Sequence, residues 1–129
     1  AFCLQGVWLC GICCCPPNNE IHKTALGAEL TVDWRYFQNT LDAVRTLQED
    51  GYIVYAIEQA HGSTLLQDIQ LPKNQKTAII MGHEVFGVQQ EVVDAANGCI
   101  EIPQYGTKHS LNVSVTAGIV MYELSNMLR

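Results

Sequence analysis

The stretch YIVYAIEQ, residues 52–59, is rich in β-branched and aromatic side chains and predicts a buried β-strand. A helix is predicted directly before it, with a cap at Asn39 or Thr40 and with Gly51 as a C-terminal glycine. The apolar positions that recur at helical spacing in this helix are Leu41, Val44 and Leu47. A helix that ends at a glycine and runs into a buried strand is the basic unit of an α/β fold.

More units of the same kind follow on both sides. Residues 6–12 (GVWLCGI), 76–82 (KTAIIMG) and 99–104 (CIEIPQ) predict three further strands. Helical patterns occupy residues 88–98 and the stretch from Leu111 to near the end of the chain. Because short apolar strands that alternate with helices are typical of parallel sheets, the 129 residues predict one α/β domain, with a mostly parallel sheet flanked by helices.

The N-terminal region is less regular. Residues 22–30 favour a short helix, and residues 31–37 favour a short strand or an extended connection. The chain starts without methionine, and its first residues look like the last turn of a helix, so we expect the natural N-terminus to lie upstream. The apolar segment 1–15 has no basic region and is shorter than a membrane span, which favours a place in the core.

Charge and cysteine content limit the partners. The net charge is −6 and no cluster of Lys and Arg occurs, which argues against nucleic-acid binding by bulk electrostatics. Three of the six cysteines are consecutive, which suits a reducing cytosol better than a disulfide framework. The CGIC motif at 10–13 has no second pair at zinc-ligand spacing, and the spacing of the four histidines matches no standard metal site. We therefore expect no metal.

The final helix is apolar nearly all round. One side carries Leu111, Val115, Gly118, Ile119 and Tyr122, and much of the other carries Val113, Ala117, Val120, Met121 and Leu124. Such a helix is buried on more than one face, and we expect it to pack against the sheet and against a partner subunit.

Three connections after the predicted strands contain unusual residues: EQAHGST (58–64), GHEVFG (82–87) and PQYGTKHS (103–110). The carboxyl ends of parallel strands are where ligands collect, so these connections outline one pocket. Their glycines let backbone groups approach a ligand closely. No phosphate-binding loop is present, which favours a phosphate-free cofactor held by backbone atoms and an apolar wall.

Two of these connections lie in longer segments that match a known family. TAIIMGHEVFGV (77–88) and GCIEIPQYGTKHSLNVSVTAGIVMYEL (98–124) closely resemble the second and third motifs of the SpoU-type RNA ribose methyltransferases of the SPOUT superfamily. PPNNEIHKTALGAE (16–29) resembles the family's segment after its first motif, so the resemblance extends over essentially the whole chain as one domain, 1–129.

The resemblance implies a parallel α/β fold with a deep C-terminal trefoil knot, which pattern analysis cannot predict because threaded chains are rare. It implies S-adenosylmethionine bound in the knot loops, homodimerisation, a cytoplasmic location, and methylation of a ribose 2′-hydroxyl in tRNA or rRNA without a metal. The implied cofactor contacts are Gln59, Ala60, Gly82, Ile102 and Leu111. The family's polar positions, to which we assign the catalytic roles, are Glu84, Ser110 and Asn112.

The sequence departs from the family in three places. His83 replaces the usual asparagine of the second motif. The first motif, with the arginine that deprotonates the ribose hydroxyl, has no counterpart, and we expect it upstream of residue 1. Ser125, Asn126 and Leu128 stand where some members carry arginines. Two alternatives therefore stay open: a non-catalytic dimerisation or RNA-associated module of this fold, and, with less support, an unrelated flavodoxin-like binding domain.

Overall fold

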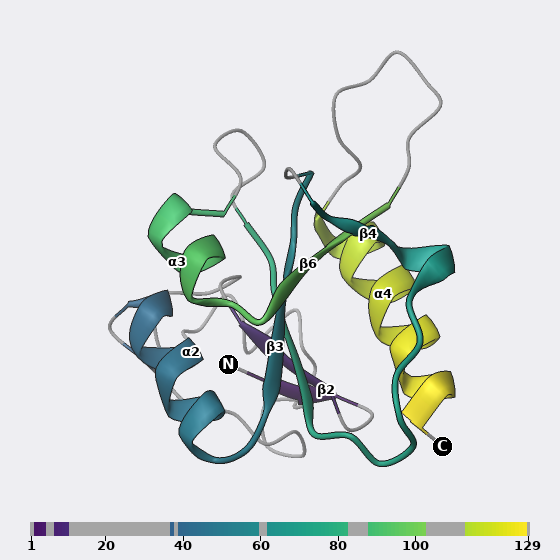
Figure 1. Cartoon of the computed structure of the whole chain (residues 1–129), viewed down its shortest axis with the longest axis horizontal. Coiled ribbons are helices and arrows are strands. Elements are labelled where there is room, and N and C mark those ends of the chain that lie inside the picture. Colours follow the sequence, from purple (N-terminus) through teal and green to yellow (C-terminus); the bar gives the residue numbers. More distant parts are fainter. Residues whose placement is uncertain are drawn as a thin grey trace, which may run out of the picture.

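The computed structural model describes residues 2–4, 7–10, 37, 39–59, 62–82, 88–102 and 113–128, which form a sheet flanked by helices (Figure 1). The strands are β1 (Phe2–Leu4), β2 (Val7–Cys10), β3 (Ile53–Ile57), β4 (Thr64–Leu65), β5 (Thr77–Ile80) and β6 (Gly98–Glu101). The helices are α2 (Thr40–Glu49), α3 (Gln90–Ala95) and α4 (Val113–Leu128), together with the 3-10 turn η2 (Leu66–Asp68). The predicted helix at 22–30 and the predicted strand at 31–37, apart from Phe37, lie outside the described residues.

The sheet confirms the predicted α/β architecture. Its strand order is β1-β2-β5-β3-β6-β4, and the five strands β2, β5, β3, β6 and β4 run parallel to one another. The four strands predicted from the sequence, β2, β3, β5 and β6, lie next to one another in it. Strand β4 and the turn η2 were not predicted, because elements of two or three residues are too short to show a period.

The prediction for the first residues was wrong. Phe2–Leu4 form a strand and not the last turn of a helix, and this strand pairs antiparallel with β2, with Phe2 opposite Leu9 and Leu4 opposite Val7. A run of three apolar residues cannot distinguish a strand from a helical turn by its period. Pairing with the edge of β2 satisfies the backbone groups of that edge, and this tertiary contact selects the strand.

Helix α2 begins and ends where the sequence predicts. The side chain of Asn39 caps it by accepting a hydrogen bond from the Asp42 N–H at 2.9 Å. Gly51 follows the helix with φ +90°, a conformation that glycine adopts without strain. The N–H of Tyr52 donates to the Leu47 carbonyl at 2.9 Å, and the N–H of Gly51 donates to the Gln48 carbonyl at 3.0 Å. These two bonds form a Schellman motif and turn the chain directly into β3.

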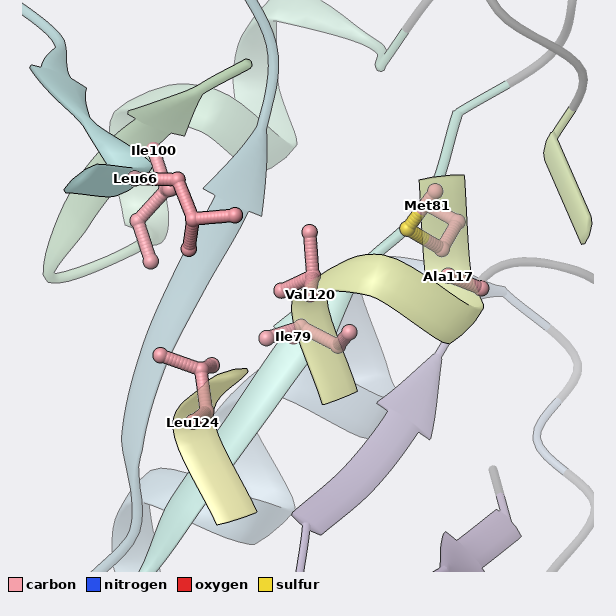
Figure 2. Packing of buried hydrophobic residues seen from close by; sticks show 7 residues of the cluster. All are labelled: Leu66, Ile79, Met81, Ile100, Ala117, Val120 and Leu124. Atoms are coloured by element: carbon pink, nitrogen blue, oxygen red, sulfur yellow. The ribbon is translucent and has the colours of Figure 1, made fainter. Parts of the chain in front are cut away.

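Two apolar clusters cover the two faces of the sheet, because side chains alternate along β3 and β5. The cluster under α2 and α3 contains Val44, Leu47, Val54, Ala56, Ala78, Ile80 and Val92. The cluster under α4 contains Leu66, Ile79, Met81, Ile100, Ala117, Val120 and Leu124 (Figure 2). Strand β5 is buried along its whole length and supplies side chains to both clusters, as expected of a central parallel strand.

Helix α4 packs on the sheet with one side only. Ala117, Val120 and Leu124 are buried there, which confirms the predicted packing against the sheet. On the other side Val115, Ile119 and Tyr122 are 51%, 40% and 64% exposed. The predicted partner subunit on that side stays a prediction. Within the described ranges, no helix is long and apolar enough to cross a membrane.

Candidate functional site

The parallel strands end together at one edge of the sheet, which we call the carboxyl edge. Ala56 of β3 lies opposite Ile80 of β5, and Ile57 of β3 lies opposite Ile100 of β6. These strands therefore stop at nearly the same height, so the residues that follow them emerge side by side. Helix α4 also begins at this end of the sheet (Figure 1). Ligands of open parallel sheets bind in this position.

Three of the predicted cofactor residues lie at the carboxyl edge. Gly82 follows β5 and is half-buried, Gln59 follows β3 and is exposed, and Ile102 directly follows β6 and is half-buried. Since β5, β3 and β6 are consecutive in the sheet, the fold brings together positions that are far apart in the sequence. Ile102 also packs against the apolar cluster under α4.

The other five predicted site residues lie outside the described residues. They are Ala60, Glu84, Ser110, Leu111 and Asn112. Ala60 comes directly after Gln59, Glu84 comes two positions after Gly82, and Asn112 comes directly before α4. The contacts of these five residues stay predictions.

Glu58 is a residue at this edge that the sequence analysis did not single out. Along β3, Val54 and Ala56 point into the cluster under α2 and α3, and Glu58 continues this alternation toward α3. Its Oε2 atom accepts a hydrogen bond from the backbone N–H of Val88 at 2.8 Å. Its Oε1 atom accepts one from the N–H of Gln59 at 3.2 Å. The sequence feature that could have revealed Glu58 is the acidic residue itself, at a position where the alternation of β3 predicts an inward-facing side chain.

Cys99 of β6 lies near Glu58 and is half-buried. Burial raises the pKa of the Cys99 thiol above its usual value, and the charge of the Glu58 carboxylate raises this pKa further. The thiol therefore stays protonated near neutral pH. This makes Cys99 a poor nucleophile, and its side chain packs against the apolar cluster under α2 and α3.

A second carboxylate at the carboxyl edge is also engaged within the protein. The hydroxyl of Ser63 donates a hydrogen bond to Oε1 of Glu101 at 2.8 Å. Glu101 is the last residue of β6, and Ser63 directly precedes β4, so the bond joins two neighbouring strands. Gly62, before Ser63, has φ +83° and allows the chain to turn there.

The described part of the carboxyl edge suits a phosphate-free organic ligand. The half-buried Gly82 and the half-buried Ile102 offer backbone groups and apolar surface, and the exposed Gln59 offers an amide. Glu58 and Glu101 accept hydrogen bonds from protein groups. Among the described residues, no group of three or more His, Cys, Asp or Glu side chains is placed to hold a metal ion; the four histidines lie outside them.

Comparison with known proteins gives consistent matches. The family described as SpoU rRNA Methylase matches residues 1–122. A tRNA (guanosine(18)-2′-O)-methyltransferase of Borreliella burgdorferi is 36% identical over 104 residues, which are 81% of this chain and 47% of that protein. The enzyme of the same name from Thermus thermophilus is 33% identical over 102 residues, 79% of this chain and 52% of that protein. The chain thus spans about half the length of the curated relatives it matches.

Solved structures share the fold. The crystal structure of an AdoMet-bound rRNA methyltransferase from Sinorhizobium meliloti superimposes with a TM-score of 0.79 at 27% identity. The match covers 95% of this chain and 46% of that one. The parallel α/β arrangement described above is therefore common to both proteins.

Proposed function

The chain belongs to the SpoU rRNA methylase family, and from this we propose that it is the cofactor-binding part of an enzyme that methylates a ribose 2′-hydroxyl of tRNA or rRNA. The cofactor is S-adenosylmethionine. The observation that carries the proposal is the placement of Gln59, Gly82 and Ile102 at the ends of three adjacent parallel strands. Relatives named as tRNA guanosine 2′-O-methyltransferases, and a neighbour solved with AdoMet, support the reaction and the cofactor.

The described residues fit this cofactor. S-adenosylmethionine carries no phosphate, so it requires close backbone groups and apolar surface and no basic cradle. Gly82 has no side chain to keep the ligand from the backbone, and the half-buried Ile102, at the end of β6, supplies apolar surface. The residues that would hold the cofactor are Gln59, Ala60, Gly82, Ile102 and Leu111.

Bound S-adenosylmethionine supplies an activated methyl group, so the protein contributes position and electrostatics. Transfer to a hydroxyl oxygen requires that donor and acceptor be aligned. We assign to Ser110 and Asn112 the fixing of the ribose or of the loop around it, and to Glu84 the ordering of the motif loops through backbone N–H groups. The proton acceptor belongs to the family's first motif, and the proposal requires no metal.

The same proposal includes the knot, the cellular location and the oligomeric state. The C-terminal part forms the trefoil knot of the family, and the protein acts in the cytoplasm. Two copies of the protein form a homodimer in which the exposed side of α4 is covered. The exposed Val115, Ile119 and Tyr122 support this last point, because large apolar side chains gathered on one helix face typically mark an interface.

A non-catalytic RNA-associated or dimerisation module is the second candidate. Two observations favour it: the net charge of −6 leaves little electrostatic attraction for RNA, and His83 replaces the asparagine of the second motif. This module would keep the fold and the dimer without methyl transfer.

One experiment on the full-length protein separates the candidates. Titration calorimetry measures S-adenosylmethionine binding, and transfer of labelled methyl groups to total RNA, mapped by nucleotide, measures activity. We expect binding, transfer to a ribose, and a loss of transfer of at least about 100-fold in Asn112→Ala, because an interaction that aligns the reacting groups is lost. Binding without transfer favours the module, and absence of binding contradicts both the cofactor and the enzyme.

A further inference from the structure

Glu58 connects two parts of the carboxyl edge that are distant in sequence. Its backbone N–H donates to the Ile100 carbonyl at 3.1 Å, which extends the β3–β6 ladder by one residue. Its side chain leaves the strand on the α3 side and binds the N–H of Val88 at 2.8 Å. The carboxylate thus holds a residue 30 positions away against the tip of β3.

Val88 is the last residue of the second motif, TAIIMGHEVFGV. Gly82 and Val88 lie on either side of residues 83–87, the segment that carries Glu84. Gly82 is placed by β5, which is buried throughout. Val88 packs against the cluster under α2 and α3, and its N–H is placed by Glu58. Of the two residues that flank 83–87, Gly82 is therefore placed by β5 and Val88 is placed by Glu58.

The bond to Val88 is a strong one of its kind. A carboxylate that accepts from a backbone N–H forms a charge-assisted hydrogen bond, which is stronger than a bond between neutral groups. The other oxygen of Glu58 accepts from the N–H of Gln59, a predicted cofactor contact. One side chain thus binds the backbone at Val88, the end of the second motif, and at Gln59, a predicted cofactor contact.

We propose that Glu58 is a positioning residue for the cofactor site: it holds the exit of the second motif, at Val88, in register with the tip of β3, at Gln59. The inference rests on the proposed function, because it assumes that Gly82 and Gln59 contact S-adenosylmethionine. Glu58 acts through these backbone groups and takes no part in proton transfer.

The test compares three variants of the full-length protein. Glu58→Ala removes both acceptor atoms. Glu58→Gln removes the charge and keeps one acceptor oxygen that can reach the Val88 N–H. Gln48→Ala is the matched control, since Gln48 donates to the Ala95 carbonyl at 2.8 Å and so ties the other end of α3 to α2. Each variant is measured for S-adenosylmethionine affinity, kcat, thermal midpoint and hydrogen exchange of the Val88 amide.

We expect Glu58→Ala to weaken S-adenosylmethionine binding by about 10- to 100-fold, the range for a lost hydrogen bond to a charged group, and to speed exchange of the Val88 amide. Glu58→Gln keeps one neutral acceptor oxygen for the Val88 N–H, so it restores part of the affinity, and kcat stays within about threefold. Gln48→Ala lowers the thermal midpoint at least as much as Glu58→Ala and leaves the affinity unchanged.

Several results overturn the inference. Wild-type affinity in Glu58→Ala shows that the bond does not position the site. A loss of kcat in Glu58→Gln with unchanged affinity assigns Glu58 to proton transfer. If Gln48→Ala weakens S-adenosylmethionine binding as much as Glu58→Ala does, the loss results from general destabilisation of α3 and not from the bond to Val88. If the wild-type protein itself does not bind S-adenosylmethionine, the proposed function fails first, and the inference fails with it.

Discussion

At the scale of single residues, the neighbouring strands β3 and β6 place the Glu58 carboxylate near the Cys99 thiol. Two causes raise the pKa of Cys99: burial, which is the larger, and the negative charge of Glu58. Both disfavour the thiolate. Since the folded state holds the thiol proton more tightly than the unfolded state, this group favours folding less as the pH rises above the unfolded pKa of the thiol.

The first prediction concerns the reactivity of Cys99. Because only thiolate reacts, the pH at which alkylation of folded Cys99 is half-maximal lies above that of the unfolded chain. Glu58→Gln lowers this midpoint by removing the charge, and the midpoint stays above the unfolded one because burial persists. The measurement is the iodoacetamide rate against pH, followed by mass spectrometry of the peptide that contains Cys99. An unchanged midpoint in Glu58→Gln would show that the two groups do not interact.

At the scale of elements, the predicted parts are those with local causes. Helix α2 has a capping side chain, an apolar stripe and a terminal glycine within its own sequence, so both of its ends were predicted. Strand β1 and strand β4 form because an edge of β2 and an edge of β6 are available, and no local sequence feature encodes that. The same holds for the candidate site. Gln59, Gly82 and Ile102 were found through motifs, whereas the bond from Val88 to Glu58 joins two ordinary sequence positions.

The cap of α2 gives a prediction at this scale. Asn39→Ala removes the acceptor of the Asp42 N–H and lowers the free energy of unfolding by about 1 kcal/mol, the usual value of an N-cap. Asn39→Ser keeps a capping oxygen and costs less than half as much. Chemical denaturation measures both variants. Equal losses in the two would mean that the cap hydrogen bond does not set the stability of this helix end.

At the scale of the whole molecule, the two faces of the sheet are covered unequally. Helices α2 and α3 cover one face, while α4 covers the other with one side and exposes Val115, Ile119 and Tyr122 on its opposite side (Figure 1). Among the described residues, these three large apolar side chains stay exposed although both clusters are filled. The proposed occupant of this surface is a second copy of the chain.

The last prediction tests this surface. Replacing both Ile119 and Tyr122 with Asp places two charges where the proposed dimer excludes water, and burial of unpaired charges is costly. We expect the dissociation constant of the dimer to rise by at least about 100-fold, which corresponds to about 2.7 kcal/mol. Arg45→Glu changes the net charge by the same amount at an exposed position of α2, on the opposite face of the sheet, and serves as the control that stays dimeric. Light scattering across a concentration series measures the oligomeric state of both variants.

Helix α4 itself remains formed in each variant, because the changed side chains lie away from Val120 and Leu124, which hold α4 on the sheet. A wild-type monomer, or a double variant that dimerises normally, would remove α4 from the interface and leave its apolar side without a partner in this assembly.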